Sequence, residues 1–441
     1  MAGEAPGQPP VPRDAARRPG MLGALRQRDF GLLWSGQALS ALGNQMFPIL
    51  LAILVLERKA GPAGLGLVLA VQAAGLAIGM GLAATIGDRW RRTRVMIGTD
   101  VVRAAGVAAL AISPARIPTA LLIVFVIVVG VSEGMFLPTY GAVLPRLLSD
   151  AYLQPGNALT ALSEYVAMVA GPAVAGVLIG LIGPGPSLWI DVATFAASIG
   201  SLLLISESAR EQSEQPQESG TAGFGTGAVR RATHDLREGL RAVLDRPWVG
   251  AWIASATIVT TLAVAPAFVA APIVARQSLG GAKAYGVMFT ALGIGSVLGS
   301  VIGGRIRARR NGLVAFAGVL TIAGSVSSLA YLPLPGIVTF WIIAGIGVTV
   351  SQILWSTAVQ QEVPDRLLGR VMALDYIGSQ GLTPLGYAAA GFVIQAIGIR
   401  DMLIAGAVIV VIVTPLPLFV RGGMTLSTGQ AAAAQLAEAG S

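Results

Sequence analysis

The sequence predicts an all-α polytopic membrane protein in which twelve transmembrane helices form two pseudo-symmetric six-helix bundles. Three observations support this fold class: the composition, the length of the apolar segments, and a repeat that relates the two halves of the chain. Of the 441 residues, 54% are hydrophobic and only 12% are charged, with a mean hydropathy of +0.73, whereas soluble domains carry roughly 25% charged residues. Because cysteine is absent, disulfides, thiolate metal sites and cysteine nucleophiles are excluded.

Twelve apolar segments are long enough to span a membrane, since a helix needs about 20 apolar residues to cross the hydrocarbon core. Prolines in the fourth, seventh and eleventh segments are expected to kink those helices; they are Pro138, Pro266, Pro272 and Pro384. The expected spans are about 30–56, 64–87, 94–112, 117–143, 158–183, 187–205, 249–275, 284–304, 312–331, 335–361, 370–396 and 401–420.

Polar segments divide the chain into five parts. The tail before the first span is rich in Pro, Ala, Gly and Arg and lacks the apolar region of a secretory signal. The expected parts are a disordered cytoplasmic tail at 1–29, an N-terminal bundle at 30–205, a cytoplasmic linker at 206–248, a C-terminal bundle at 249–420 and a cytoplasmic tail at 421–441.

The linker has two kinds of sequence. Its first part is rich in Ser, Glu, Gln and Gly, which predicts flexibility. Farther along, apolar residues fall at helical spacing among arginines; they are Leu236, Leu240, Val243 and Leu244. We expect an amphipathic helix here, held on the inner leaflet by apolar burial and anionic lipid. The only histidine, His234, lies in the same stretch and is expected to be solvated.

The distribution of Lys and Arg predicts that both termini are cytoplasmic. In that orientation the cations concentrate in cytoplasmic segments, above all at 89–94, 206–248 and 305–310. The loops of the other side hold Arg58, Lys59, Arg116, Arg276, Lys283 and Arg400. An excess of cations on the cytoplasmic side is the general rule, and an even number of spans agrees with it.

The two halves of the chain repeat one pattern. Small residues recur at every fourth position in the second span, and the eighth span repeats them at a constant offset before a second basic loop. Small residues at this spacing let helices approach closely in lipid. The two sets are Gly75, Gly79, Ala83 and Gly87, and Ala291, Gly295, Gly299 and Gly303.

Two related six-helix halves with a basic loop after the second span resemble the major facilitator superfamily. The family's signature in that loop is Gly-x-Leu-Ala-Asp-Arg-x-Gly-Arg-Arg. Asp88, Arg89 and Arg92 match it, whereas Ala84, Ile86 and Arg91 depart from it. Further motifs are similar to the branch that contains enterobactin exporters and macrolide efflux pumps. These are the Asp100 and Arg103 pair, Leu144 to Leu147, Gly156 to Leu159, Gly171 to Gly176, and Val363 to Val371.

The resemblance implies a cytoplasmic gate at Asp88, Arg89 and Arg92. A carboxylate beside several guanidiniums forms charge-assisted bonds, and such a cluster can latch one bundle to the other in one conformation. The alternative is that the arginines only set the topology and contact lipid phosphate.

Ionisable groups inside spans are the second class of candidate, because a charge near the bilayer centre is costly unless it is paired, protonated or facing a cavity. Glu133, near the middle of span four, is the first candidate for proton coupling or for contact with a cationic substrate, and Glu164 in span five is the second. The alternative for Glu133 is a neutral carboxyl that is hydrogen-bonded for packing. Asp191 and Asp375 lie nearer to span ends and are expected to be caps or interfacial charges. Asp100 and Arg103, three residues apart, are expected to form a structural or coupling pair.

The family architecture implies a central cavity lined mainly by spans 1, 4, 7 and 10. Mostly apolar walls with a few polar points suit amphiphilic organic molecules, although each of these side chains could instead bond two helices together. The candidate lining residues are Asn44, Gln45, Gln72, Tyr140, Tyr165, Thr257, Gln352, Trp355 and Gln380.

We therefore expect a monomeric secondary transporter in a bacterial inner membrane that exports a small amphiphilic compound, a drug or secondary metabolite, by proton antiport. Its partners would be the small-molecule substrate, protons and lipid, with no nucleic acid, cofactor or metal. A siderophore exporter is the alternative, and a non-transporting scaffold or receptor is a third. A membrane transferase is disfavoured, because the chain lacks paired carboxylates for a metal-pyrophosphate and a histidine base on a span.

Overall fold

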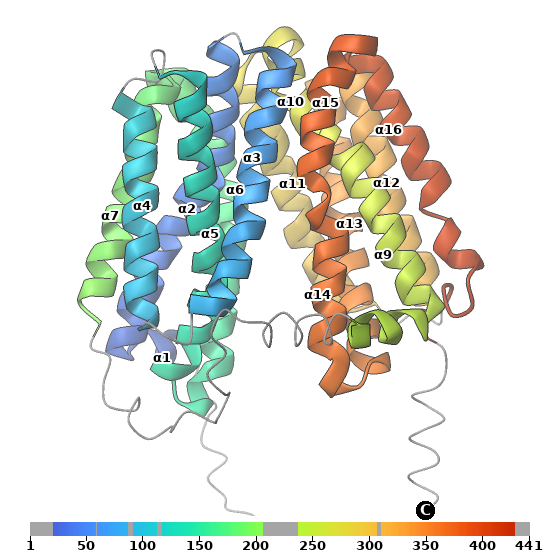
Figure 1. The fold of residues 1–441 in the computed structure, drawn as a ribbon, viewed down its shortest axis with the longest axis horizontal. Coiled ribbons are helices and arrows are strands. Elements are labelled where there is room, and N and C mark those ends of the chain that lie inside the picture. The colour runs from blue at the N-terminus through green and yellow to red at the C-terminus, as the bar shows by residue number, and fades with distance from the viewer. Residues whose placement is uncertain are drawn as a thin grey trace, which may run out of the picture.

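The computed structural model describes residues 21–58, 60–86, 91–112, 117–205, 237–306 and 310–427, and these ranges are helical without any strand. Figure 1 labels the helices along the chain. The first half contains α1 (Met21–Leu25), α2 (Arg28–Glu57), α3 (Gly61–Ile86), α4 (Arg92–Ile112), α5 (Thr119–Leu147), α6 (Asp150–Ile182) and α7 (Pro184–Leu203). The second half contains a short helix at 237–244 and then α9 (Pro247–Val259), a π-helical turn (Thr260–Val264), α10 (Ala265–Ser278), α11 (Ala282–Gly303), α12 (Asn311–Tyr331), α13 (Leu334–Glu362), α14 (Asp365–Gly381), α15 (Thr383–Ile397) and α16 (Ile399–Val413), followed by a 3₁₀ turn (Leu416–Phe419).

The all-helical membrane fold expected from the sequence is confirmed. Eleven helices in the described ranges are long and apolar enough to cross a membrane. The eleventh expected span differs, because it consists of two helices, α14 and α15, that meet at Leu382. Pro384 stands at the start of α15 and cannot donate a backbone hydrogen bond to the preceding turn, which explains the break.

The seventh span is also irregular. The π-helical turn Thr260–Val264 joins α9 to α10, directly before Pro266. Since Pro266 has no N–H, the regular hydrogen-bond ladder cannot continue through it, and a wider turn accommodates the change. Pro138 lies within α5 and Pro272 within α10, where each helix continues past the proline.

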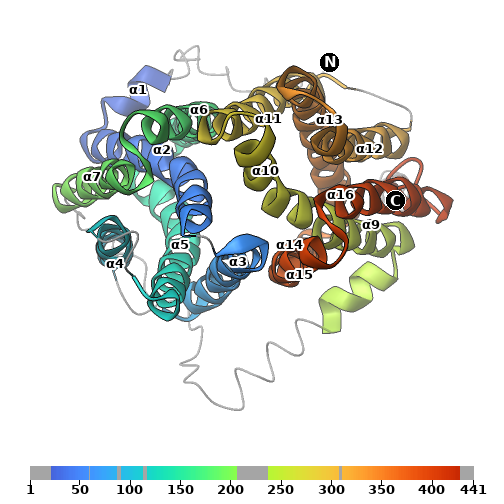
Figure 2. The ribbon, with the colours of Figure 1, turned by 90° about the horizontal axis from the view of Figure 1, so that it is seen from above.

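The helices form two groups that lie side by side, α1 to α7 on one side and α9 to α16 on the other (Figure 1, Figure 2). We call the end of the molecule at which α7 ends and the helix at 237–244 lies the linker side, and the other end the far side (Figure 1). Small residues pack the helices within each group, as the repeat predicts. Gly79 of α3 and Gly134 of α5 each face the other helix's backbone so closely that an added Cβ would lie under 3.0 Å from it. Gly295 of α11 and Gly345 of α13 repeat this contact in the second group.

The two bundles meet through backbone contacts towards the far side. Gly391, late in α15, packs on Pro62 and Ala63 at the start of α3, and Gly286, early in α11, packs on Pro172 and Gly176 of α6. Figure 2 shows both helix pairs: α3 adjoins α15, and α6 adjoins α11. Toward the linker side the ribbons of the two bundles diverge (Figure 1).

Both ends of the described chain are more ordered than the expected tails. Residues 1–20 lie outside the described ranges, but α1 is helical and its Ala24 is fully buried. At the other end, residues 421–427 fold back against the second bundle, and Leu426 is 1% exposed. Leu426 adopts a left-handed backbone conformation with φ of 56°, which non-glycine residues seldom adopt.

The helix at 237–244 packs on the second bundle. Ala242 and Val243 are buried in an apolar cluster with residues of α9 and α13, and Glu238 forms an ion pair with Arg370 of α14. Leu240 and Leu244 are exposed. The apolar residues expected to face the inner leaflet are therefore divided, because Val243 packs on the protein and Leu240 and Leu244 do not. Leu236 and His234 lie outside the described residues.

Candidate functional site

Polar side chains of three helices meet inside the N-terminal bundle, around Arg103 of α4. We define the Arg103 cluster as Asn44 of α2, Asp100 and Arg103 of α4, and Asp191, Thr194 and Ser198 of α7. All of them except Asn44 are buried, and Asp100, Asp191 and Ser198 have no exposed surface. Such a polar group inside an apolar bundle is expensive unless its members bond to one another.

Close packing of α2 on α7 creates the cluster. A Cβ added at Gly43 of α2 would lie under 3.0 Å from the side-chain oxygens of Asp191 and Thr194, and one at Gly36 would clash in the same way with Ser201. The two glycines are seven residues apart and therefore share one face of α2. That face meets a polar stripe along α7, which lets the polar groups bond between helices rather than face lipid.

Arg103 and Asp100 are paired, as the sequence predicts, but they also have partners on other helices. The Nη1 atom of Arg103 lies 3.7 Å from Oδ1 of Asp100, and its Nη2 atom donates to Oδ1 of Asn44. Ser198 donates from Oγ to Oδ2 of Asp100 at 2.6 Å, and Gln37 donates to Ser198 Oγ at 2.8 Å. The pair is thus the centre of a network that joins α2, α4 and α7.

Aromatic rings complete the surroundings of Arg103. Its guanidinium carbon lies 4.5 Å from the ring centroid of Phe195 and 5.9 Å from that of Phe136. A guanidinium over an aromatic face is attracted by the ring quadrupole, more strongly where water is excluded. Arg103 is therefore held by two rings, a carboxylate and an amide.

Asp191 lies farther from the end of its helix than the sequence predicts. Gly183, with φ of 83°, makes a tight turn after α6, so that α7 already begins at Pro184. Asp191 consequently lies within the helix and is fully buried, and the expectation of a cap or interfacial charge is wrong. Thr194 Oγ1 lies 3.4 Å from Asp191 Oδ1, whereas Oδ2 is buried and has no hydrogen-bond partner among the described residues.

Glu133, the first candidate for proton coupling, lies in the middle of α5 beside this cluster. Its carboxyl interacts electrostatically with Arg103 and with Tyr376 of α14. Tyr376 belongs to the other bundle and is 39% exposed. Glu133 is itself partly exposed, so it stands between the buried cluster and the second bundle. Its role in proton coupling stays a prediction.

Glu164, the second proton-coupling candidate, is exposed on α6 and interacts electrostatically with Tyr140. Tyr140 exchanges a hydrogen bond with Thr160 at 3.2 Å and stacks on Phe136 with ring centroids 6.1 Å apart. Tyr140 therefore bonds α5 to α6 within one bundle.

The expected gate lies mostly outside the described residues, because Asp88 and Arg89 fall in the gap between 86 and 91. Arg92 stands at the start of α4 and donates from Nη1 to the carbonyl oxygen of Ala142 in α5 at 2.6 Å. This bond joins the linker-side ends of two helices of the same bundle. A latch between bundles stays a prediction.

The expected cavity residues fall into two groups. Gln45, Tyr165, Gln352 and Gln380 have exposed side chains, as residues of a solvent-accessible wall would. Others bond within a bundle: Asn44 to Arg103, and Thr257 of α9 to the carbonyl oxygen of Gly378 in α14 at 2.8 Å. Gln72 of α3 is partly exposed.

Trp355 is part of the packed interior of the C-terminal bundle. It is 2% exposed, lies between Trp248 and Trp252 with ring centroids 5.6 and 5.9 Å away, and donates from Nε1 to Oδ2 of Asp375 at 3.0 Å. This bond explains how α14 can carry Asp375 near the helix middle. Trp355 therefore supports α14 in this structure, rather than standing on an open wall.

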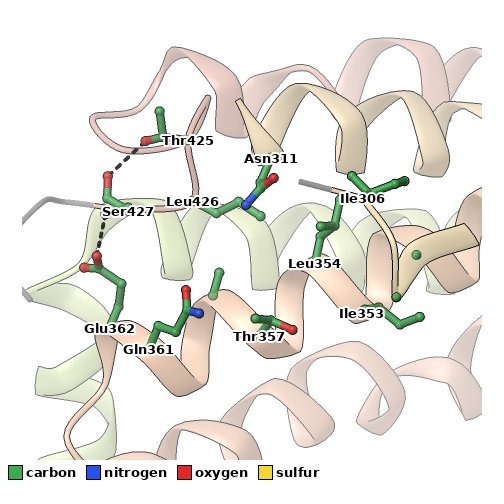
Figure 3. Close-up of a pocket in the computed structure, with 13 residues that line it drawn as sticks. Ile306, Asn311, Ile353, Leu354, Thr357, Gln361, Glu362, Thr425, Leu426 and Ser427 are labelled. Carbon is green, nitrogen blue, oxygen red and sulfur yellow. Dashed lines mark hydrogen bonds between the residues drawn. The ribbon is translucent and has the colours of Figure 1, made fainter. Parts of the chain in front are cut away.

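A separate cavity of about 640 Å³ lies on the linker side of the C-terminal bundle. Figure 3 shows it between the end of α13, the start of α12 and the segment at 425–427. Ser427 donates from Oγ to Oε1 of Glu362 there, and Thr425 donates to the carbonyl oxygen of Ser427 at 3.1 Å. This cavity was not expected from the sequence, because the segment that closes it was expected to be a tail.

Two bundles of membrane-spanning helices with buried ionisable groups define a multi-pass membrane protein, and its similarity to transporters in family, sequence and fold makes it a transporter rather than an enzyme. The chain belongs to the Major Facilitator Superfamily, because the profile of that family matches residues 33–383. The family-level resemblance inferred from the sequence is confirmed.

Individual relatives have low sequence identity to the chain or match only part of it. The chain is 34% identical to a gentisate transporter of Corynebacterium glutamicum over 155 residues, which are 32% of this chain and 34% of that protein. It is 24% identical to the uncharacterised MFS-type transporter YfiS of Bacillus subtilis over 399 residues, 88% of this chain and 92% of the relative. The nucleoside transporter NupG, in a mutant form, superposes with a TM-score of 0.73 at 13% identity, covering 88% of this chain and 99% of NupG. That similarity shows the fold alone.

Proposed function

We propose that the protein is a secondary active transporter that exports a small amphiphilic organic compound in exchange for protons. The bundles would rock about a site near the membrane midplane, as in other transporters built from repeats. The linker side would face the cytoplasm of a bacterium, because the cations of the chain concentrate in the loops of that side.

The position of Glu133 carries the proton-coupling proposal. A carboxyl in the middle of a membrane-spanning helix persists only if it is paired, protonated or in contact with water. In the described part of the chain, the carboxyl of Glu133 interacts electrostatically with Arg103, which can compensate its charge, and with Tyr376 of the opposite bundle. A group placed between the bundles can exchange a proton with either side as they rock, which is what antiport requires.

The contacts between the bundles support an alternating-access cycle. The described backbone contacts at Gly286 and Gly391 lie toward the far side, whereas the ribbons diverge toward the linker side (Figure 1). We assign this arrangement to a state open to the cytoplasm. Gly286 and Gly391 would separate in the opposite state, because backbones in contact leave no room for a passage.

The walls favour a neutral or cationic cargo. Arg103 is occupied by Asp100, Asn44 and two aromatic rings, so it is not free to bind an anion. Exposed Gln45, Gln352 and Tyr165 offer hydrogen bonds without charge, which suits amphiphilic molecules. The motifs that resemble the enterobactin-exporter and macrolide-efflux branch support export.

A small aromatic acid is the second candidate cargo. The similarity to a gentisate transporter favours it, although that similarity extends over 32% of this chain. A siderophore with catechol rings belongs to the same chemical class. Such an anionic cargo would need a cation at the site, and Arg103 could serve only by leaving Asp100.

Transport by vesicles tests both candidates. Inside-out membrane vesicles from a pump-deficient bacterium, expressing the protein, are supplied with an amphiphilic cationic dye or with gentisate under an imposed proton gradient. We expect gradient-dependent dye accumulation that Glu133→Gln abolishes, with protein levels unchanged. Asp401→Asn, which removes an exposed carboxylate of α16, should retain it. Full transport by Glu133→Gln would refute the coupling role. Transport of gentisate without transport of the dye would replace the amphiphilic compound by an aromatic acid as the proposed cargo.

A further inference from the structure

The Arg103 cluster and its neighbour Glu133 contain more carboxyls than cations. Asp100, Asp191 and Glu133 all interact electrostatically with Arg103, which is the one cation facing them in the described part of the chain. With every group ionised, this region would hold two uncompensated negative charges. Glu133 is partly exposed, but Asp100 and Asp191 are fully buried, so at least one of these charges would be buried. Because an uncompensated buried charge is strongly destabilising, the cluster must retain a proton.

Among the described residues, no neighbouring helix supplies a further cation to Asp191. The facing side chains of α2 are the neutral Gln37 and Asn44, and α4 contributes only Asp100 and Arg103. Glu133 of α5 adds a negative charge. On α6, which also contacts α7, Glu164 is exposed. The charge balance therefore depends on how Arg103 is shared.

The ion pair and the length of the hydrogen bonds distinguish the two aspartates. Each has one buried oxygen without a hydrogen-bond partner among the described residues, Oδ1 of Asp100 and Oδ2 of Asp191. In Asp100 that oxygen lies 3.7 Å from Arg103 Nη1, and the other one, Oδ2, accepts a 2.6 Å bond from Ser198, which are the contacts of an ionised carboxylate. Asp191 has one long bond, 3.4 Å from Thr194, and its Oδ2 atom is buried without a partner among the described residues. Equal burial with unequal partners implies that a retained proton resides on Asp191.

We propose that Asp191 is a proton-binding residue within the N-terminal bundle, and that its occupancy depends on which carboxyl Arg103 pairs with. Binding is the uptake of one proton by the Asp191 carboxylate, which forms one O–H bond and changes no other covalent bond. When Glu133 is ionised it competes for Arg103, and Asp191 keeps its proton. When Glu133 takes up a proton, Arg103 is free to pair with Asp191, which then releases one.

This inference deepens the proposed function, since it assigns a second proton-binding residue to the same transporter, but its test needs no cargo. The full-length protein is reconstituted in lipid, and infrared difference spectra between acidic and alkaline pH are recorded. A protonated buried carboxyl gives a carbonyl-stretch band that shifts in D₂O. We expect this band in the wild type at neutral pH, and Asp191→Asn should remove one component of it. Asp401→Asn, at an exposed position of α16, should leave the band unchanged.

A stability comparison within the cluster provides a second readout. Asn has the shape of a protonated Asp, so Asp191→Asn should unfold at the wild-type temperature at neutral pH. Asp100→Asn, at equal burial, should unfold at a lower temperature, because it leaves Arg103 without its carboxylate. The reverse order, or an infrared band that survives Asp191→Asn and disappears in Asp100→Asn, would overturn the assignment. If the vesicles show no proton-driven transport but the infrared band loses a component in Asp191→Asn, the antiport function is rejected and the proton-binding role of Asp191 is retained.

Discussion

Replacing Gly43 by alanine tests whether the Arg103 cluster depends on the close approach of α2 and α7. The added methyl group would lie under 3.0 Å from the side-chain oxygens of both Asp191 and Thr194. These atoms belong to short, buried side chains on the facing helix, so they cannot swing away as the end of a long flexible side chain could. The two helices must therefore separate, or the cluster must rearrange.

The expected cost follows from the packing. Inserting a methylene-sized group into a packed core typically costs about 1–3 kcal/mol. Alanine is at the same time better than glycine in a helix by up to about 1 kcal/mol, which partly masks the clash. Gly98→Ala on α4 is the matched control, because its Cβ would meet nothing within 4 Å. The difference between the two variants isolates the clash and should be about 1–3 kcal/mol, a factor of about 5–150 in the unfolding equilibrium.

Equilibrium unfolding of the purified protein in mixed micelles, followed by helical circular dichroism as denaturing detergent is added, measures this difference. Gly43→Ala should unfold at lower detergent than the wild type, and Gly98→Ala at the same or higher detergent. If both variants are equally stable, α2 and α7 do not approach as closely as the structure has them, and the argument for a tightly enclosed Asp191 fails.

Two further substitutions test the contacts between bundles and the C-terminal segment. Gly286→Leu should prevent α11 from closing on α6 and favour the opposite state. Maleimide should then label Gln352→Cys more slowly, by about tenfold if the clash is worth about 1.4 kcal/mol, and the natural chain has no cysteine to interfere. Unchanged labelling would contradict this prediction. Leu426→Ala should lower the unfolding free energy by about 2 kcal/mol or more, since Leu426 is 1% exposed. Phe419→Ala, 82% exposed, is its control, and equal stability of these two variants would show that the segment does not contribute to the core.

The spans could be predicted from hydropathy because a lipid-facing helix must be apolar along its whole length. The predicted ends of the spans were less accurate where prolines and glycines determine the helix boundary. Pro184 and Gly183 start α7 earlier than the apolar run suggests, and Pro384 divides the eleventh span. The shift at α7 turned Asp191 from an expected end residue into a buried one.

The side-chain contacts between helices could not be predicted from the sequence. Asn44 and Arg103 are 59 positions apart, and Asp100 and Ser198 are 98 positions apart, so no local spacing connects them. A signal for the cluster did exist in α7, where Ser187, Asp191, Thr194, Ser198 and Ser201 recur at helical spacing. This polar stripe, on a helix otherwise apolar enough to span a membrane, marks a face that must meet other polar groups.

The sequence by itself determined the membrane-spanning helices, the relation between the halves and the superfamily, because hydropathy, small-residue spacing and the basic loops are local properties of the chain. It also singled out Glu133 and the Asp100–Arg103 pair as ionisable groups inside spans. Only the tertiary structure decided that Asp191 shares Arg103 with both, and that Trp355 lies in the packed interior. Charge balance and burial depend on which helices lie side by side, and that is a property of the folded bundle.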